Sequence, residues 1–422
     1  MSNDLHILAA VRTPFCKFGT DLAALTADDL GRHVCSSLLT RTGIDPGELS
    51  EVIFGCVAQP AEAANVARVI ALRSGVPEHV PAVTVHRNCA SGMEAITTAH
   101  QRLATGQGDL FLVGGAESMS NVPLFYHPRA AKKFTRLSRA KSFLDKLRAL
   151  SAFRPGDFAP RVGLELGLTD PVSGMIMGDT AEVLAREYSL SREQQDRFAA
   201  ESQQRAHAAS ENDQFAREIA PVPVAGHAIE RDNGVRADST AKNLAKLRPI
   251  FDRTTGTVTA GNSSQITDGA AALLVGSERA AQRLGLESLG RLTAYAYAGC
   301  DPARMGLGPV HAIARLVEQT KIDLDTADLV EINEAFAAQV LAVLATLKDP
   351  SRHHHDLPAI DIPREKLNRR GGAIGLGHPV GATGARLVLT ALDQLGESGG
   401  QRALATLCVG GGQGAALWLE RP

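Results

Sequence analysis

The sequence is poor in aromatic residues and in cysteine, and its cysteines are not paired. Aromatic residues make up 4% of the 422 residues, and the six cysteines stand far apart without a C-x-x-C pair. Scattered single cysteines argue against both a disulfide framework and a zinc ribbon. We therefore expect a protein of a reducing compartment without a metal site.

Long apolar runs and a strong net charge are also missing. No apolar run reaches the roughly 18 residues that a membrane-spanning helix needs, and the first residues lack the basic and apolar segments of a signal peptide. The formal net charge of −2 gives no general attraction to nucleic acid. These absences predict a soluble, cytoplasmic protein with no nucleic-acid partner.

The sequence is rich in glycine and in alternating patterns. It contains 40 glycines, and 44% of its residues are apolar. Short apolar runs such as 110–118 alternate with longer helical patterns such as 90–105, which is typical of an α/β fold with a mainly parallel sheet. Because the length exceeds one comfortable core, we expect two packed units or one duplicated body.

The two halves of the chain share short stretches. Residues 327–339 (ADLVEINEAFAAQ) echo 50–59 (SEVIFGCVAQ), and residues 405–416 (ATLCVGGGQGAA) echo 110–118 (LFLVGGAES). This likeness predicts a duplicated body in which the strand ends of both halves meet at one centre.

A basic stretch interrupts this pattern. Residues 129–150 carry eight Lys or Arg against one acid, Asp145, and Phe134, Leu144 and Leu147 fall near one helical face. A basic amphipathic helix of this kind suits a phosphate-bearing ligand, a partner or a membrane surface. A solvated charged face is an equally good interpretation.

Three consecutive histidines stand at positions 353–355. Adjacent side chains diverge on a helix or a strand, and zinc ligands are normally spaced further apart. We therefore expect no metal there and interpret the triplet, which has a proline nearby, as an exposed loop.

One cysteine stands where a strand gives way to a helix. Cys89, in TVHRNCASGMEA (84–95), follows an apolar β-branched run and precedes a predicted helix. Taken alone it is a core residue, as free cysteines usually are. At a helix start, however, unpaired N–H groups and the dipole stabilise a thiolate and lower its pKa, so Cys89 is a candidate nucleophile. We hypothesise that the preceding His86 and Arg87 hold the thiolate or the loop.

A thiol nucleophile needs a base, and a glycine-rich loop supplies one. The stretch 369–387 (RRGGAIGLGHPVGATGARL) holds six glycines around His378, and the following proline restricts the backbone. Gly375, Gly377 and Gly381 suggest a dinucleotide loop, but their spacing is G-x-G-x-x-x-G. An NAD-binding enzyme therefore stays a minor alternative.

Two further strand ends carry polar or reactive groups. Cys408 ends an apolar strand just before Gly410, and the free amides of such a turn can form an oxyanion hole. Asn333 follows another apolar strand, where its amide can fix a catalytic water. The ordinary alternative for Asn333 is helix capping.

Taken together, NCASGMEA, NEAFAAQ, GGAIGLGHPVGATGAR and LCVGGGQG, in this order, resemble the thiolase family over essentially the whole chain. The resemblance implies a duplicated, five-layered αβαβα thiolase fold with an inserted loop region. It divides the chain into 1–118, the first part of the N-terminal half; 119–248, the loop region with the basic insertion; 249–290, which completes the N-terminal half; and 291–422, the C-terminal half.

The resemblance also implies catalytic roles on CoA thioesters. Cys89 would accept the acyl group, His378 would deprotonate it, and Cys408 would serve as acid and base at the α-carbon of acetyl-CoA. One oxyanion site would combine His378 with a water held by Asn333, and the other would use the N–H groups of Cys89 and Gly410. Coenzyme A would be a substrate, with no permanently bound cofactor.

Five contacts to CoA are implied in the same way. They are Arg236 near the adenine end, Ala260 and Ser264 in the segment 257–271 (TVTAGNSSQITDGAA), and Met177 and Phe336 along the pantetheine channel.

Departures from the pattern of short-chain biosynthetic thiolases narrow the choice of substrate. Ile176 stands where biosynthetic members often carry histidine, and insertions at about 128–173 and 348–363 look similar to thiolase subunits of fatty-acid β-oxidation complexes. We therefore expect a 3-oxoacyl-CoA thiolase, with acetyl-CoA C-acetyltransferase as the runner-up. The implied partners are further copies in a homodimer or homotetramer, a β-oxidation hydratase/dehydrogenase subunit, and a membrane surface at 129–150.

Two other classes share the resemblance less well. A decarboxylating ketoacyl synthase typically uses one cysteine with two histidines, or with a histidine and an asparagine, so Cys408 argues against it. A non-catalytic lipid carrier would have lost a catalytic residue, and Cys89, Asn333, His378 and Cys408 are all present.

Overall fold

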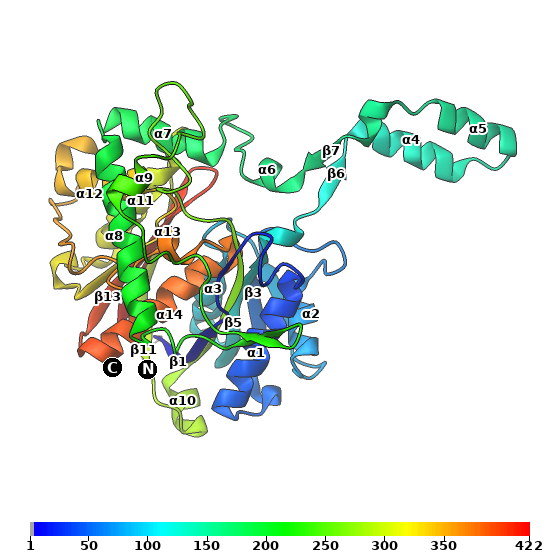
Figure 1. Ribbon diagram of the computed structural model, residues 1–422. Coiled ribbons are helices and arrows are strands. Elements are labelled where there is room, and N and C mark those ends of the chain that lie inside the picture. The colour runs from blue at the N-terminus through cyan, green and yellow to red at the C-terminus, as the bar shows by residue number, and fades with distance from the viewer. Residues whose placement is uncertain (1–3) are drawn as a thin grey trace.

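A ten-stranded sheet runs through the computed structural model, which describes residues 4–422 (Figure 1). Its order is β12-β13-β14-β11-β1-β10-β5-β3-β4, with β2 beside β10. The strands of the N-terminal half are β1 (Leu5–Arg12), β2 (Cys16–Lys17), β3 (Glu51–Gly55), β4 (Ala82–Val85), β5 (Leu110–Ser118) and β10 (Thr267–Gly276). Those of the C-terminal half are β11 (Gly290–Gly299), β12 (Leu329–Ile332), β13 (Arg402–Val409) and β14 (Gln413–Glu420).

The sheet is mixed, so the expectation of a mainly parallel sheet is wrong. Strand β3 runs parallel to β4 and β5, and β12 runs parallel to β13, whereas the other pairs in this sheet are antiparallel. A short turn at Gly410–Gly412 joins β13 to β14, and a turn of that length permits only an antiparallel pair. A short antiparallel contact between β1 and β11 joins the two halves.

Helices divide the molecule into five layers. Helices α1 (Ala27–Thr42) and α2 (Val66–Arg73) share a core with the N-terminal strands, and α11 (Gly308–Thr320) and α12 (Ala337–Lys348) share one with the C-terminal strands. Between them, α3 (Ser91–Ala104) and α14 (Val380–Ser398) share a third core with strands of both halves. Because the middle layer touches both halves, it brings the starts of α3 and α14 together.

The remaining elements connect these layers. The helices are α6 (Gly163–Gly167), α7 (Met177–Glu187), α8 (Arg192–Glu211), α9 (Ala241–Leu244), α10 (Glu278–Leu284) and α13 (Ala373–Leu376). Short 3-10 turns are η1 (Pro46–Glu48), η2 (Met119–Asn121), η3 (Pro155–Phe158), η4 (Pro302–Leu307), η5 (Leu324–Thr326) and η6 (Pro350–Arg352). Two small ribbons pair β6 (Leu124–Tyr126) with β7 (Pro160–Val162) and β8 (Val222–Val224) with β9 (His227–Ile229).

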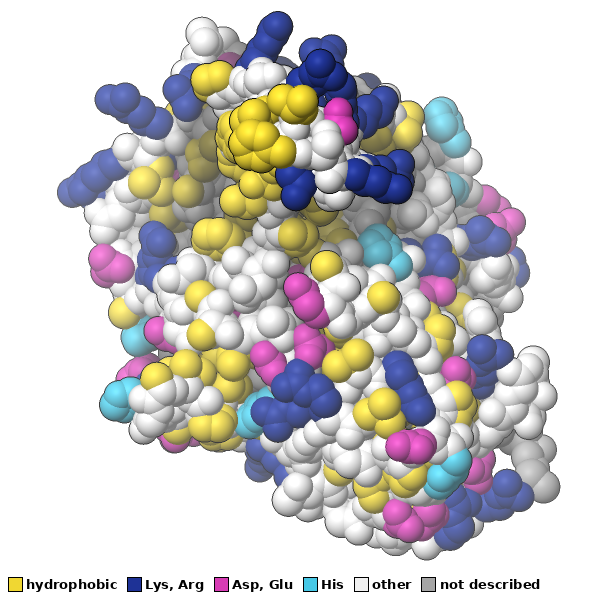
Figure 2. All heavy atoms as spheres, turned by 90° about the vertical axis from the view of Figure 1, so that its right-hand side faces the viewer, with side chains coloured by type: hydrophobic (Ala, Val, Ile, Leu, Met, Phe, Trp, Pro, Cys, Tyr) yellow, Lys and Arg dark blue, Asp and Glu magenta, His cyan; other side chains and the backbone are white. Residues whose placement is uncertain are grey.

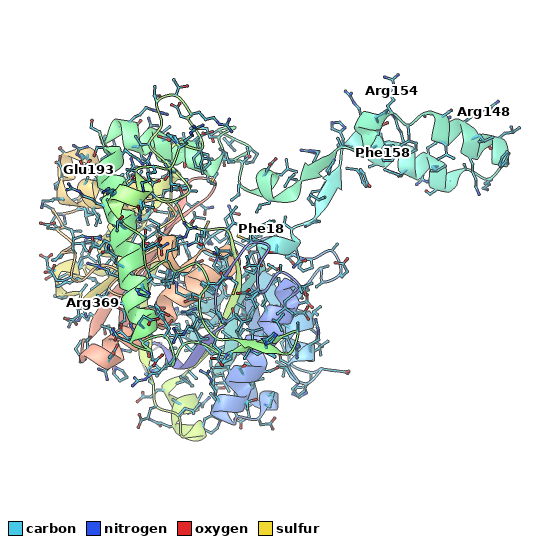
Figure 3. All side chains as sticks on the ribbon, in the orientation of Figure 1. Phe18, Arg148, Arg154, Phe158, Glu193 and Arg369 are labelled. Atoms are coloured by element: carbon cyan, nitrogen blue, oxygen red, sulfur yellow. The ribbon has the colours of Figure 1, made fainter. Side chains whose placement is uncertain are left out.

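The basic stretch forms an arm that projects from the body (Figure 1). It contains two helices, α4 (Pro128–Arg139) and α5 (Phe143–Ser151), so the interpretation as one amphipathic helix is wrong. The chain breaks at Ala140, which is extended, and Ser142 starts the second helix by accepting a bond from the N–H of Asp145. Phe134 packs among the rings of Tyr126, Phe153 and Phe158 at the base of the arm. Figure 3 shows Arg148, Arg154 and Phe158 on this arm, away from the sheet.

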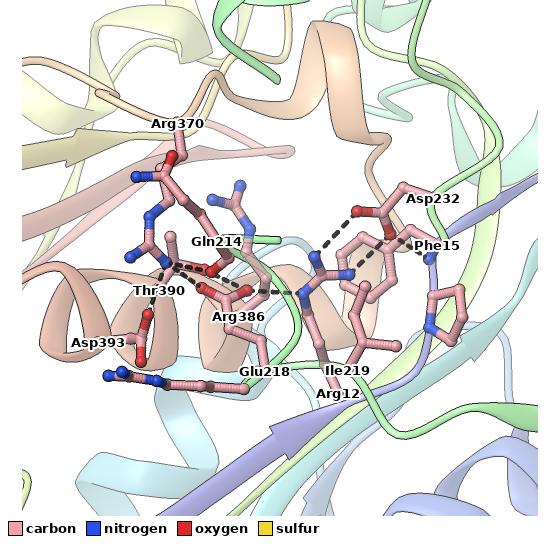
Figure 4. Close-up of polar contacts among 12 residues, drawn as sticks. Arg12, Phe15, Gln214, Glu218, Ile219, Asp232, Arg370, Arg386, Thr390 and Asp393 are labelled. Atoms are coloured by element: carbon pink, nitrogen blue, oxygen red, sulfur yellow. Dashed lines mark hydrogen bonds and ion pairs between the residues drawn. The ribbon is translucent and has the colours of Figure 1, made fainter. Parts of the chain in front are cut away.

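A buried charge network ties the region 119–248 to both halves of the chain (Figure 4). The fully buried Arg12 of β1 pairs with Glu218 at 2.9 Å and with Asp232 at 2.7 Å. Glu218 is also paired with Arg370 at 3.3 Å, and Arg370 with Asp393 of α14 at 2.6 Å. Since breaking one partner of a buried pair leaves an uncompensated charge, this network fixes the segment 218–232 against the body.

Candidate active site

Cys89 lies in a tight turn between β4 and α3. Asn88, just before it, has a φ of 43°, a left-handed conformation that asparagine tolerates better than most residues. The side-chain N–H of Asn88 donates to the carbonyl oxygen of Gly410 at 2.7 Å. The backbone N–H of Gly410 in turn lies within hydrogen-bonding reach of the Cys89 thiol. The nucleophile candidate is therefore held against the turn that follows Cys408.

Burial raises the pKa of the Cys89 thiol, although the N–H groups of Gly410 and of Cys89 itself act in the opposite direction. The expectation that its pKa falls is wrong, because the loss of water around a thiolate outweighs the favourable amides. The thiol is therefore protonated in the free protein and needs a base to become a nucleophile.

Cys408 is the next-to-last residue of β13 and belongs to a buried apolar cluster. Burial raises its pKa well above the ordinary value, and the nearby Cys89 adds to this shift. The hydrogen bond from Asn88 to Gly410 holds the turn after Cys408 against the turn that carries Cys89. The next residues turn sharply, with φ values of 85° at Gly411 and 79° at Gly412, which glycine adopts without strain. All six cysteines are free thiols within residues 4–422.

His378 stands in the turn between α13 and α14 and is 8% exposed. Its Nδ1 lies 2.6 Å from the hydroxyl of Thr383, and that hydroxyl donates to the carbonyl oxygen of Pro379 at 3.0 Å. Because the hydroxyl proton is already used, Nδ1 must carry the imidazole proton and donate it. The lone pair then sits on Nε2, which is buried and has no hydrogen-bond partner among residues 4–422.

Burial and the nearby Arg386 lower the pKa of His378 to about 4. A neutral imidazole with a free Nε2 lone pair is the state that a general base requires.

Asn333 directly follows β12 and is fully buried. Neither its side-chain oxygen nor its side-chain nitrogen has a partner in the described part of the chain. Helix capping is excluded, because α12 begins four residues later with Phe336 as its N-cap. A buried amide without partners is costly, so this one suits a water or a substrate atom.

Three of the candidate CoA contacts lie near one another. Phe336 and Met177 belong to the same apolar cluster as Cys408, and the N–H of Ser264 donates to the carbonyl of Ala335 at 2.9 Å. Ala260 and Arg236 lie at the surface, outside this cluster.

Arg87 does not point its charge at the thiol. Its guanidinium pairs with Glu94 at 2.6 Å and lies 4.1 Å from the ring centre of Tyr297. This geometry favours the hypothesis that Arg87 holds the loop over the hypothesis that it holds the thiolate.

The sequence reasoning missed the buried residues Thr383 and Glu117 around the site, and it gave no role to the buried Glu334, which follows Asn333. Glu334 accepts hydrogen bonds from Ser202 at 2.5 Å and from Asn368 at 2.8 Å, which fixes the loop before His378. The position of Glu117 could have indicated its role. It lies near the end of a strand in which every residue is buried, and a buried carboxylate must have hydrogen-bond partners.

The histidine triplet forms no metal cluster. His355 Nε2 lies 2.8 Å from His311 Nδ1 on α11, so this part of the loop is packed and not fully exposed. Within the described residues, no group of three or more His, Cys, Asp or Glu side chains could hold a metal ion. No helix of residues 4–422 has both the length and the apolar character needed to cross a bilayer.

Comparison with known proteins places these observations in a family. Residues 5–279 match the model described as Thiolase, N-terminal domain, and residues 286–421 match Thiolase, C-terminal domain. The chain is 43% identical to the beta-ketoadipyl-CoA thiolase of Pseudomonas aeruginosa, with 100% of both chains covered. It is 40% identical to a probable acetyl-CoA acyltransferase of Staphylococcus aureus, with 98% of both covered.

Solved structures agree over nearly the whole length. The acetyl-CoA acetyltransferase of Bacillus anthracis matches with a TM-score of 0.88 and 38% identity, covering 99% of this chain and 98% of that one. Human mitochondrial 3-ketoacyl-CoA thiolase in complex with CoA matches with a TM-score of 0.86 and 35% identity, with the same coverage.

Proposed function

The chain belongs to the thiolase family of acyltransferases, and from this premise we propose that it cleaves 3-oxoacyl-CoA with free CoA. The products are acetyl-CoA and an acyl-CoA shortened by the acetyl unit. One observation supports the proposal: the hydrogen bond from Asn88 to Gly410, at 2.7 Å, brings the turn that carries Cys89 against the turn that follows Cys408. Two separate thiols suit a reaction that makes an acyl-enzyme and also protonates a carbon atom.

In the first half-reaction, Nε2 of His378 takes the Cys89 thiol proton as the sulfur attacks the 3-keto carbon. The bond between carbons 2 and 3 then breaks, which leaves the acyl group on Cys89 and the electron pair on the acetyl-CoA enolate. Cys408 donates its thiol proton to carbon 2 of this enolate, and acetyl-CoA leaves.

In the second half-reaction, free CoA gives its thiol proton to the Cys408 thiolate and attacks the Cys89 thioester. The shortened acyl-CoA forms, and the Cys89 sulfur leaves and recovers its proton from His378. Both cysteines and the histidine return to their starting states, so the cycle balances.

Each half-reaction develops negative charge on a thioester or keto oxygen. We assign one oxyanion site to His378 with a water on Asn333, and the other to the backbone N–H groups of Cys89 and Gly410. The unpartnered side chain of Asn333 supports the first site. The approach of the Gly410 N–H to Cys89 supports the second.

For the CoA moiety we propose that Met177, Phe336 and Ser264 line the pantetheine path, because they lie beside the Cys408 cluster. Ala260 and Arg236 would follow toward the surface, with Arg236 near the adenine end. We keep the division of the chain into 1–118, 119–248, 249–290 and 291–422 as part of the proposal.

We propose a role in fatty-acid β-oxidation in the cytoplasm. Ile176, next to Met177, supports acyl chains longer than the acetoacetyl group of the biosynthetic alternative. The likeness to a beta-ketoadipyl-CoA thiolase adds 3-oxoadipyl-CoA as a second candidate substrate.

The arm provides the proposed contact with a membrane surface. Phe143 and Leu144 are 75% and 65% exposed, and Arg136, Arg139 and Arg148 line a hollow beside them. Figure 2 looks toward this arm and shows apolar and basic side chains together on it. Homodimers or homotetramers, and a hydratase/dehydrogenase subunit, are the protein partners that we propose.

Acetyl-CoA labelling tests the proposed function. Incubation with acetyl-CoA should add one acetyl group to the peptide that contains Cys89, and Cys89→Ser should abolish the adduct. An adduct on another residue, or none, would overturn the mechanism. Thiolysis rates on 3-oxoacyl-CoA substrates from short to long chains, and on 3-oxoadipyl-CoA, would then rank the candidate substrates.

A further inference from the structure

Glu117 is a buried carboxylate that no step of the proposed reaction uses. It lies at the end of β5 and is 1% exposed. Its oxygens accept three backbone N–H groups: Val57 at 3.0 Å, Ala58 at 2.9 Å and Gly381 at 2.9 Å. A carboxylate whose hydrogen-bond donors are all backbone amides holds loops in place more directly than it balances a charge.

The three amides come from the two segments that flank the site. Gly381 is in the first turn of α14, three residues after His378, and two residues before the Thr383 hydroxyl that orients the imidazole. Val57 and Ala58 follow β3 and Cys56. Glu117 therefore links the base of the His378 turn to the loop at the end of a neighbouring strand.

Gly381 packs closely against β5 and α3. A Cβ built on Gly381 would lie 2.9 Å from both Ala116 O and the Glu117 carboxylate, and one built on Gly115 would lie 1.9 Å from Gly381 O. A Cβ on Gly92, in the first turn of α3, would lie 3.0 Å from the same oxygen. The start of α14 is thus in contact with β5 and with the helix that begins just after Cys89.

We propose that Glu117 is a positioning residue whose carboxylate holds the start of α14, and through it Nε2 of His378, in line with Cys89. The inference rests on the proposed thiolase function, in which that nitrogen takes the Cys89 proton. A small displacement of a general base lowers the reaction rate strongly. We call the three hydrogen bonds from Val57, Ala58 and Gly381 to Glu117 the clamp, and we expect it to affect turnover more than substrate binding.

Ionisation of Glu117 sets the strength of this clamp. Burial raises its pKa to about 7, and the neighbouring Asp268 of β10 adds to the shift, whereas the three amides oppose it. The other titratable groups that interact with it are the thiols of Cys56 and Cys89. The ionised carboxylate accepts three N–H bonds, but a protonated carboxyl has one hydroxyl that accepts poorly. The clamp should therefore tighten as the pH rises through 7.

Glu117→Gln tests this role, because glutamine keeps the shape and loses the charge and one acceptor. At about pH 8 we expect kcat to fall about tenfold or more with KM within about twofold, and Cys89 acetylation to slow in parallel. Toward about pH 6 the gap between the variant and the unmodified protein should narrow, because the native carboxylate is then protonated.

Two further variants guard against a purely structural effect. Asp28→Asn removes another mostly buried carboxylate of the N-terminal half, one that pairs with the exposed side chain of Arg73, and should leave kcat and its pH profile unchanged. Glu117→Asp keeps the ionisable carboxyl group and should fold even where the glutamine variant fails. Its kcat should still rise as the pH rises through 7, as in the unmodified protein.

The outcomes separate the inference from the proposed function. If Cys89 of the unmodified protein takes no acetyl group, both the proposed function and the positioning role of Glu117 are overturned. If Cys89 is acetylated as fast in Glu117→Gln as in the unmodified protein, only the positioning role of Glu117 is overturned. A loss of activity that is the same at every pH and is shared by Asp28→Asn also overturns it, because it would mark a general loss of packing.

Discussion

Asn88 and Gly410 are separated by more than 300 residues in the sequence, yet the side-chain N–H of Asn88 donates to the carbonyl of Gly410 at 2.7 Å. This bond joins the turn that carries Cys89 to the hairpin that follows Cys408. The N–H of the same glycine, in the preceding peptide unit, lies within reach of the Cys89 thiol.

Asn88→Gly should loosen this link without straining the backbone, because glycine accepts the φ of 43° at this position. We expect Cys89 acetylation to slow about tenfold, since the Gly410 amide no longer stays aligned with the thioester oxygen. The free energy of unfolding should change by only about 1 kcal/mol, the usual value of one hydrogen bond. Mass spectrometry of acetylation reactions stopped at successive times measures the rate, and denaturant titration measures the free energy of unfolding.

Ser189→Gly is the matched control for that variant. Ser189 also has a left-handed backbone, with a φ of 52°, but it is exposed at the end of α7. It should leave acetylation unchanged. An Asn88→Gly protein that acetylates as fast as the Ser189 control would mean that the bond has no role in aligning Gly410.

Much of the candidate site could be predicted because its residues sit at ends of elements that are visible in the sequence. Cys89, Asn333 and Cys408 each follow or end a short apolar run. In the structure Cys89 lies between β4 and α3, Asn333 directly follows β12, and Cys408 is the next-to-last residue of β13. Such signals are local, so they survive without knowledge of the fold.

What could not be predicted depends on contacts between distant segments. The pKa of Cys89 is raised by burial, against the opposing effect of the Gly410 N–H. The pKa of His378 is lowered by burial and by Arg386, and Thr383 fixes its tautomer. The direction of the strands likewise follows from the pairing of distant segments.

The break between the two helices of the arm, by contrast, was predictable from the sequence. Ser142 followed by Asp145 is a helix-start signal within the basic stretch.

Cys408→Ala should separate the two half-reactions. Acetylation of Cys89 from acetyl-CoA needs no proton transfer at carbon. In the variant, His378 can pass the Cys89 proton to the leaving CoA thiolate in place of Cys408, so we expect the adduct to form. Cleavage of 3-oxoacyl-CoA should fall about 10²–10⁴-fold, the usual value of a lost general acid. Mass analysis of the adduct and a thiolysis assay on the same protein check this. A variant that loses both reactions equally would argue against a separate role for Cys408.

Alkylation of Cys89 should depend on pH in a defined direction. Burial raises the pKa of this thiol, so the thiolate fraction, and with it the rate of reaction with iodoacetamide, should grow steadily as the pH rises through 7, 8 and 9. His378, with a pKa of about 4, stays neutral over that range and adds no inflection. A plateau below about pH 8 would contradict this, because it would indicate a thiolate already stabilised in the free protein.

The exposed apolar side chains of the arm offer a test of the proposed membrane contact. Replacing Phe143, Leu144 and Leu147 by serine should abolish sedimentation with vesicles rich in anionic lipid, while thiolysis of a short substrate stays within about twofold. Each basic residue near an anionic surface adds about 1 kcal/mol, so binding should weaken with salt and be poor on zwitterionic vesicles. The matched control, Leu72→Ser with Leu289→Ser, removes exposed leucines from the body and should leave sedimentation unchanged. If the arm variant still binds anionic vesicles, or if it instead changes the size of the assembly in solution, the arm contacts protein and not lipid.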